Sequence, residues 1–152
     1  MNGFSMAFIQ LPLVRETCGE AVRMPEDIWR ICADIGGLAQ ESFHVLALNG
    51  KNRLLSRYMV SLGLVDASLV HPREVFRTAI SHNASAVALA HNHPSGDPSP
   101  SAEDVRITRQ MIQAGKILDI AVMDHVIIGR ANGLQKGFLS MREAGLCDFG
   151  KA

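Results

Sequence analysis

The stretch from residue 86 to residue 104 limits what this chain can fold into more than any other part of the sequence. It begins with a short, purely apolar run at residues 86–90, which is typical of a strand buried on both faces. His91 and His93 follow this run, and a loop with one glycine and three prolines then leads to Ser101. Serine before an amphipathic run is a typical helix start. We therefore expect a buried strand that feeds directly into a helix, with both histidines at the carboxyl end of the strand.

Three segments of the chain carry helix signals. They combine a proline or serine at the start, acidic residues in the first turn and apolar residues at helical spacing. We expect these helices at residues 25–37, at residues 72–80 and from Ser101 to about Ala114. Gly115 is the predicted stop of the third helix, because glycine commonly follows a helix end.

Strand patterns lie between the helical segments. Residues 43–48 and a second run from Arg53 are separated by Asn49-Gly50, which is the strongest short-range signal for a tight hairpin turn. Two further strands are expected at residues 117–122 and 125–128. Strands interleaved with helices in 152 residues predict a single α/β domain, in which helices cover a sheet that includes an antiparallel hairpin.

Composition and charge exclude several classes of protein. The formal net charge is +0, so the chain lacks the basic excess of a typical DNA-binding protein. A local basic cluster could still form from Arg53, Arg57, Arg73 and Arg77, but scattered solvated arginines are the simpler interpretation. The longest purely apolar run is far too short for a membrane span, and the first residues make a poor signal peptide. Three scattered cysteines indicate free thiols in a reducing compartment. We expect a cytoplasmic protein with no membrane partner.

His91, His93 and Asp104 have the residue types and the spacing of a zinc site. Side chains two apart in a strand project to the same side, so the two histidines can face one point. The loop then returns the chain towards that point, where Asp104 in the first turn of the next helix adds a carboxylate. Two imidazoles and one carboxylate suit zinc and leave a fourth position for water.

Helix capping explains part of the same pattern. Ser101 and Asp104 have the spacing of a capping box, in which the serine accepts a backbone hydrogen bond and the acidic residue returns one. The two histidines would then simply end a strand in water. From the residue types alone, a metal site and a capped helix both remain open.

The spacing H-x-H-x7-S-x2-D resembles the JAMM metal motif of the JAB/MPN metalloprotease superfamily. Its four fixed positions are filled by His91, His93, Ser101 and Asp104. The chain closely resembles the bacterial RadC family over roughly residues 41–145. The segments that carry this resemblance are HPREVF, HNHPSGDPSPSAED and DHVIIG, in this order along the chain. The resemblance implies a JAB/MPN-like mixed β-sheet flanked by helices over residues 25–152. The sequence ahead of the first helix, residues 1–24, is expected to be an extension or edge strand.

The resemblance also implies a role for each residue. In JAMM proteins an upstream glutamate acts as general acid and base on water activated by zinc. Glu41, just before the strand at residues 42–48, is the matching position, in preference to Glu74 on the second helix. Ser101 would stabilise the oxyanion that develops during the reaction. The implied ligands of the zinc ion are His91, His93 and Asp104. The implied reaction is hydrolysis of a peptide or isopeptide bond in an unidentified peptide or protein.

Other candidate residues have simpler explanations. Asp124-His125 also resembles a RadC signature, but such a step beside a strand is more often a hydrogen-bonded pair in the core. Asp97 lies where it could contact a substrate, although a turn explains an aspartate there. The remaining histidines lack partners at ligand spacing, and we expect surface or packing roles for His44, His71 and His82.

We expect one part of the RadC pattern to be absent. These proteins usually carry a helix-hairpin-helix region ahead of the JAMM domain, whereas only about forty residues precede Glu41 in this sequence. The family's traditional DNA-repair label therefore transfers poorly. Two hypotheses follow: a zinc-dependent metallopeptidase or isopeptidase, and a DNA-repair-associated binding module whose metal site is structural. Glu41 and Ser101 favour the first, because a structural site needs neither a free base nor an oxyanion donor.

Overall fold

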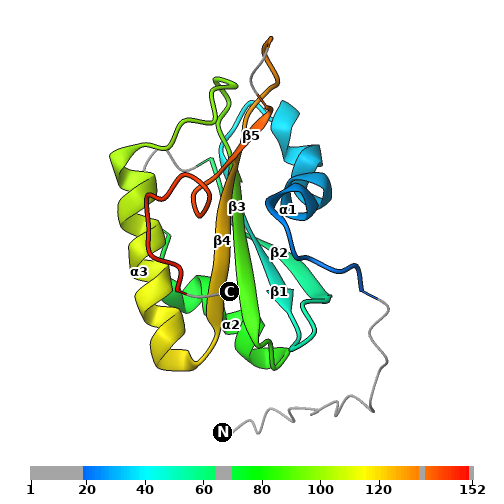
Figure 1. Ribbon diagram of the computed structural model, residues 1–152, viewed down its shortest axis with the longest axis vertical. Helices are drawn as coiled ribbons and strands as arrows, with labels where there is room; N and C mark the ends of the chain where they lie inside the picture. Colours follow the sequence, from blue (N-terminus) through cyan, green and yellow to red (C-terminus); the bar gives the residue numbers. More distant parts are fainter. Residues whose placement is uncertain (1–18, 64–69, 134–135, 151–152) are drawn as a thin grey trace, which may run out of the picture.

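A mixed five-stranded β-sheet forms the centre of the protein (Figure 1). The computed structural model describes residues 19–63, 70–133 and 136–150. The strands are β1 (Ser42–Leu48), β2 (Leu54–Leu62), β3 (Ala86–Asn92), β4 (Ala121–Ile128) and β5 (Phe138–Ser140). Their order is β2-β1-β3-β4-β5, with β3 and β4 parallel and all other neighbours antiparallel. The predicted α/β class with a mixed sheet is confirmed.

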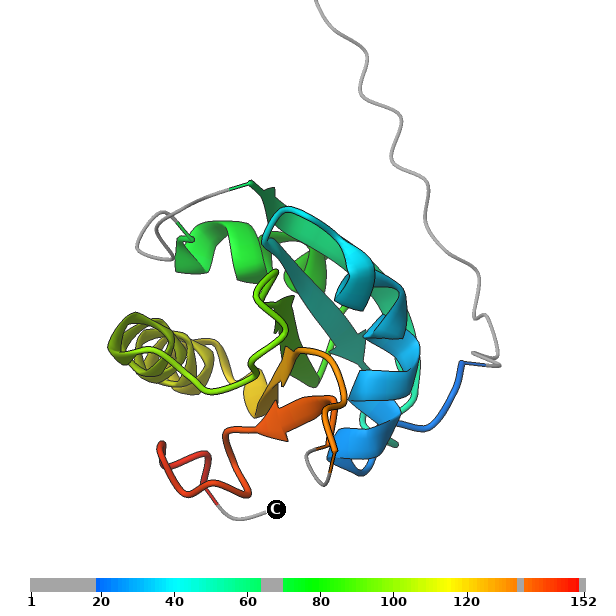
Figure 2. The ribbon, with the colours of Figure 1, turned by 90° about the horizontal axis from the view of Figure 1, so that it is seen from above.

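Helices cover both faces of the sheet, so the domain has three layers (Figure 2). Helix α1 (Pro25–Cys32), followed by a 3₁₀ turn at Ala33–Gly37, lies on one face. Helices α2 (Pro72–Ser81) and α3 (Ala102–Leu118) lie on the other. The core on the α3 side packs side chains such as Val45, Leu89, Ile127, Phe76, Ile107 and Met111. In the described part of the chain, every helix is too short or too polar to cross a bilayer.

The predicted hairpin between β1 and β2 forms, but its turn is longer than the two residues expected. The side-chain oxygen of Asn49 accepts hydrogen bonds from the amides of Lys51 and Arg53. The left-handed residue of the loop is Asn52, with φ of 58°, and not Gly50. The asparagine therefore organises a wider loop by imitating the backbone, which a two-residue prediction from Asn-Gly does not capture.

Helix α3 continues past Gly115, where we predicted its end. A Cβ at this position would lie 2.3 Å from the carbonyl oxygen of Ile120, so the glycine allows the helix to pass close to the chain that enters β4. Asp119 ends the helix in the left-handed conformation, with φ of 56°. Residues 117 and 118, predicted as strand, are therefore helical.

β4 is one strand, where we predicted two, and it contains a β-bulge. Val87 on β3 pairs with Val122, and Leu89 pairs with His125, so two steps on β3 match three steps on β4. The extra residue inverts the alternation of side chains beyond it, and it turns His125 towards α3. The C-terminal part of the chain, where we predicted no strand, adds β5 beside β4.

The expected N-terminal extension at residues 1–24 is described only from residue 19. There, Ala21 forms an isolated bridge with Arg53, and the amide of Val22 donates to the carbonyl of Asn52. The chain therefore enters the domain beside the β1–β2 hairpin. The remainder of the predicted extension, including Cys18, lies outside the described residues.

Candidate metal centre

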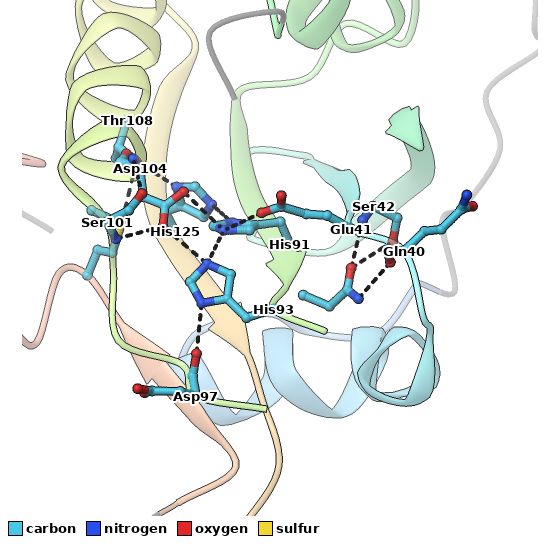
Figure 3. A network of polar contacts seen from close by, with 12 residues as sticks. Gln40, Glu41, Ser42, His91, His93, Asp97, Ser101, Asp104, Thr108 and His125 are labelled. Atoms are coloured by element: carbon cyan, nitrogen blue, oxygen red, sulfur yellow. Dashed lines mark hydrogen bonds and ion pairs between the residues drawn. The ribbon is translucent and has the colours of Figure 1, made fainter. Parts of the chain in front are cut away.

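Four side chains from three elements converge at the carboxyl end of β3 (Figure 3). Each of Glu41, His91, His93 and Asp104 offers one ligand atom, and these atoms all lie within 4.8 Å of one another. The structure thus brings together four of the five residues that the sequence singled out as a site. What each does there remains a prediction.

Strand register places Glu41 beside the histidines. β1 runs antiparallel to β3, with Phe43 opposite His91, so the residue just before β1 lies next to the end of β3. The Glu41 carboxylate lies 3.5 Å from Nε2 of His91. Its side chain is 30% exposed, whereas that of His91 is 3% exposed. Glu41 therefore stands at the open side of the cluster.

Asn92, between the two histidines, fixes the backbone on both sides of Glu41. Its Oδ1 accepts from the amide of Ser42 at 2.7 Å and from the Ser42 hydroxyl at 3.2 Å. Its Nδ2 donates to the carbonyl of Gln40 at 3.0 Å. Because the side chain of Asn92 is fully buried, these three hydrogen bonds form with little competition from water. The strand end that carries the histidines and the strand start that carries Glu41 are thereby held together.

Asp104 bridges the two histidines. Its Oδ1 lies 3.2 Å from Nε2 of His91, and its Oδ2 lies 3.2 Å from Nε2 of His93. Burial by itself would raise the pKa of Asp104, but the attraction of both imidazoles in their protonated form and the hydrogen bond from the Ser101 amide hold this pKa well below its ordinary value. The Asp104 carboxylate is therefore negatively charged and would attract a cation bound between it and the two histidines.

The predicted capping box is present and orients the same carboxylate. The Ser101 hydroxyl accepts from the Asp104 amide at 3.0 Å, and the Ser101 amide donates to Asp104 Oδ2 at 2.9 Å. Capping and ligand placement were alternatives in the sequence, and here one contact does both. Ser101 itself is exposed, and its hydroxyl hydrogen is not used by the cap, because the oxygen accepts.

His93 is held by the loop that precedes α3. Its Nδ1 lies 2.8 Å from the carbonyl oxygen of Asp97, which can only accept, so Nδ1 carries the ring hydrogen. Nε2 of the neutral ring then directs its lone pair towards Asp104. Burial lowers the pKa of His93, but the protonated ring would donate to Asp104 through Nε2 and to the Asp97 carbonyl through Nδ1, and these two contacts raise the pKa above its ordinary value. The backbone of Asp97, rather than its carboxylate, serves the cluster.

Behind His91 lies a buried chain of polar contacts that the sequence analysis missed. Nδ1 of His91 lies 2.7 Å from Nε2 of His125, and Nδ1 of His125 lies 2.6 Å from the Thr108 hydroxyl. That hydroxyl donates to the carbonyl of Asp104 at 2.6 Å. Burial lowers the pKa of His125 well below its ordinary value, so the ring is neutral.

Asp124 and His125 were expected to form one hydrogen-bonded core pair. Both are buried and hydrogen-bonded, but their side chains belong to different networks. Asp124 accepts from the amides of His125 and Arg142 and from the Ser140 hydroxyl, so it secures the bulge and the C-terminal segment. His125 contacts the metal cluster. The only sequence signal for this was the RadC-like wording around DHVIIG, because spacing alone cannot reveal a bulge.

The four-residue cluster fits a zinc-like cation. Ligand atoms around tetrahedral zinc lie about 3.4 Å apart, given bonds of about 2.0–2.1 Å to nitrogen and oxygen. The Nε2 atoms of His91 and His93 lie 3.0 Å apart, and each carboxylate oxygen of Asp104 lies 3.2 Å from one of them. Two imidazole nitrogens that both present lone pairs at this distance repel each other unless a proton or a metal cation lies between them. A positive charge at the centre of these four ligand atoms would therefore stabilise the cluster.

The other candidates lie away from the cluster. Glu74 is in the first turn of α2 and lines a separate hollow, together with Arg73 and Arg77. Arg57 pairs with Asp34, and Arg53 donates to the carbonyl of Gly19. Of the remaining histidines, His44 contacts the Ser42 hydroxyl, His82 contacts the Thr78 carbonyl and His71 precedes α2.

Comparisons with known proteins agree on one family. A family model described as "RadC-like JAB domain" matches residues 22–146. A UPF0758 protein of Caldanaerobacter subterraneus subsp. tengcongensis is 45% identical over 140 residues, which cover 90% of this chain and 58% of that protein. Another from Symbiobacterium thermophilum is 55% identical over 109 residues, covering 72% and 44%. A third, from Desulforamulus reducens, is 44% identical over 126 residues, covering 82% and 53%. The chain spans about half the length of these curated relatives.

Proposed function

The chain belongs to the RadC-like JAB domain family, and we propose that it is a zinc-dependent hydrolase of peptide or isopeptide bonds. The observation that carries the proposal is the position of Glu41. A carboxylate that is 30% exposed stands 3.5 Å from a buried imidazole, at the open side of a cluster with two histidines and an aspartate. A general base needs this combination of contact and access, because it must reach both a water molecule and the substrate.

Zinc held by His91, His93 and Asp104 would polarise a substrate carbonyl and lower the pKa of a water molecule. Glu41 would take the proton from the attacking water and deliver it to the leaving nitrogen. The hydrogen bonds of Asn92 with the Ser42 amide and the Gln40 carbonyl, which form a clamp around Glu41, keep Glu41 in place for both proton transfers. The free hydroxyl hydrogen of Ser101 would donate to the oxyanion that forms at the carbonyl.

The alternative hypothesis, a structural metal site in a DNA-repair-associated module, gives Glu41 a different role. It would complete the coordination as a fourth ligand and leave no position for water. The formal net charge of +0 gives no support to a DNA partner. Glu41→Gln separates the two hypotheses, because it removes a base but retains the shape of the side chain.

The first measurement is the metal content of the purified protein. We expect close to one zinc per chain, lost in the double variant His91→Ala/His93→Ala. Parent and Glu41→Gln are then compared on a library of peptides and isopeptides. A hydrolase with Glu41 as its base keeps zinc in Glu41→Gln but loses cleavage.

Three results would decide against this function. Loss of zinc in Glu41→Gln would make this residue a ligand of a closed, structural site. A parent protein that cleaves nothing but retards DNA in a gel would favour the binding module. If the parent binds no transition metal at all, the metal site itself is wrong.

A further inference from the structure

We propose that His125 and Thr108 are positioning residues that fix the hydrogen of His91 on its Nδ1 atom, so that Nε2 is free to bind the metal. The inference rests on the proposed zinc site and extends it to two residues outside the JAMM motif, one on β4 and one on α3. Both are fully buried, so no water molecule can substitute for either contact.

The direction of the hydrogen bonds follows from the Thr108 hydroxyl. This group has one hydrogen and two polar neighbours at 2.6 Å, the carbonyl oxygen of Asp104 and Nδ1 of His125. The carbonyl can only accept, whereas an imidazole nitrogen can carry a hydrogen, so both contacts are hydrogen bonds only if the hydroxyl donates to the carbonyl. With its hydrogen used, the Thr108 oxygen can only accept in its 2.6 Å contact with His125. Nδ1 of His125 therefore carries a hydrogen.

The same reasoning passes through His125 to His91. A neutral imidazole has one ring hydrogen, so Nε2 of His125 is an acceptor when Nδ1 is the donor. The hydrogen in the 2.7 Å contact between the two rings then belongs to Nδ1 of His91. Nε2 of His91 is left with a lone pair, 3.2 Å from Asp104 and 3.0 Å from Nε2 of His93. If these hydrogen bonds had the opposite donor and acceptor roles, the hydrogen of His91 would lie on Nε2 and would prevent this atom from binding the metal.

The contacts form a closed circuit around the site. From His91 they pass through His125 and Thr108 to the carbonyl of Asp104, whose own carboxylate returns to His91 (Figure 3). The ring of Phe43 stacks on His91 at 5.9 Å and meets His125 edge-on at 5.3 Å, which limits rotation of both imidazoles. The β-bulge in β4 directs the side chain of His125 towards His91 and Thr108. Two ligands from different elements are thus held by one buried network.

Zinc affinity of the full chain tests the proposal without a substrate. Metal-free protein is titrated with zinc against a competing chromogenic chelator. We expect His125→Phe, which keeps the ring but has no acceptor, to bind zinc about 10–100-fold more weakly, the range for loss of an outer partner of a metal ligand. His125→Gln should recover most of the affinity, because its amide oxygen can accept the hydrogen of His91 Nδ1.

Thr108→Val and Thr108→Ser form a matched pair that retains His125. The valine has the shape of threonine without the hydroxyl, so we expect a weaker but detectable loss of zinc affinity. The serine keeps the hydroxyl and should bind zinc like the parent. The visible spectrum of the cobalt(II)-substituted protein adds a direct view of the ligands, and it should change in His125→Phe and Thr108→Val only.

The outcomes separate this inference from the proposed function. A parent that binds zinc, with folded His125→Phe and Thr108→Val that bind it equally well and show the parent cobalt spectrum, would overturn the positioning role alone. A parent that binds no zinc would overturn the metal site and this inference with it. If His125→Phe does not fold, the Thr108 pair decides the matter.

Discussion

The two faces of the sheet bury polar side chains at the same level but use them differently. On the α1 side, the side-chain oxygen and nitrogen of Asn92 form hydrogen bonds with neighbouring backbone and hydroxyl groups. On the α3 side, Nε2 of His91, Nε2 of His93 and the Asp104 carboxylate point at one another. The first arrangement satisfies its polar atoms within the protein, whereas the second leaves acceptors that converge on a point.

This difference shows which buried polar groups indicate a site. Burial by itself does not, because a hydrogen-bonded side chain such as Asn92 is a stable part of a core. Convergence of acceptors without a donor does, because it is unfavourable unless a cation joins them. On this basis, changes on the α3 side should alter metal binding, and changes on the α1 side should alter folding stability.

The largest expected effect is on the α3 side, in Asp104→Ala. Zinc binding of about 10–16 kcal/mol in structural sites, divided over four positions, makes one ligand worth about 2.5–4 kcal/mol, or roughly 70- to 900-fold in affinity. We expect a loss of this size in a chelator competition. Asn92→Ala is the control, and its zinc affinity should stay near that of the parent. Equal losses in both variants would contradict the distinction between the two faces.

Asn92→Ala should instead destabilise the protein. It leaves the buried Ser42 amide without its partner and removes the hydrogen bond to the Gln40 carbonyl, which should lower the free energy of unfolding by about 2–3 kcal/mol. Urea denaturation of the metal-free protein measures this loss. If Asn92→Ala unfolds like the parent, the clamp around Glu41 contributes nothing to the fold.

Periodicity and turn signals were enough to predict the class of the fold and the strand that ends at the histidines. They work where one residue type determines local geometry, such as Pro25 at a helix start or Ser101 at a helix cap. They failed at Gly115, whose role depends on how closely α3 passes the carbonyl of Ile120. That contact joins two elements and leaves no periodic signal in the sequence.

The site shows the same limit. His91, His93 and Asp104 lie within fourteen residues of one another, so their spacing carries the metal motif. His125 reaches the cluster only because a bulge shifts the alternation of β4, and no pattern of apolar residues predicts a bulge. Glu41 was placed by resemblance, and its proximity to His91 depends on the β1–β3 register.

Ser101 tests whether one residue on the α3 side serves both folding and chemistry. Ser101→Ala removes the helix cap, which should lower the free energy of unfolding by about 1 kcal/mol. If the hydroxyl also stabilises an oxyanion, kcat should fall by about 100-fold or more on any substrate found, far beyond the effect on stability. Ser101→Thr keeps the hydroxyl and should restore both. If kcat falls no more than the smaller fraction of folded protein explains, Ser101 acts only as a helix cap.

The smallest expected effect is a difference in sign between two histidines as pH changes in the metal-free protein. Burial lowers the pKa of His44 on the α1 side, so its contribution to stability is present above its unfolded pKa and is lost as pH falls. The pKa of His93 is raised by Asp104 and the Asp97 carbonyl despite burial, so its contribution is present below its unfolded pKa and is lost as pH rises.

Thermal unfolding between about pH 5 and pH 8, on either side of the ordinary histidine pKa, reads out both contributions. Relative to the parent, His44→Gln should gain stability towards acid pH, and His93→Gln should lose it there. If both variants shift in the same direction, the carboxylate of Asp104 does not control the charge of His93, and the convergent arrangement on the α3 side loses its electrostatic basis.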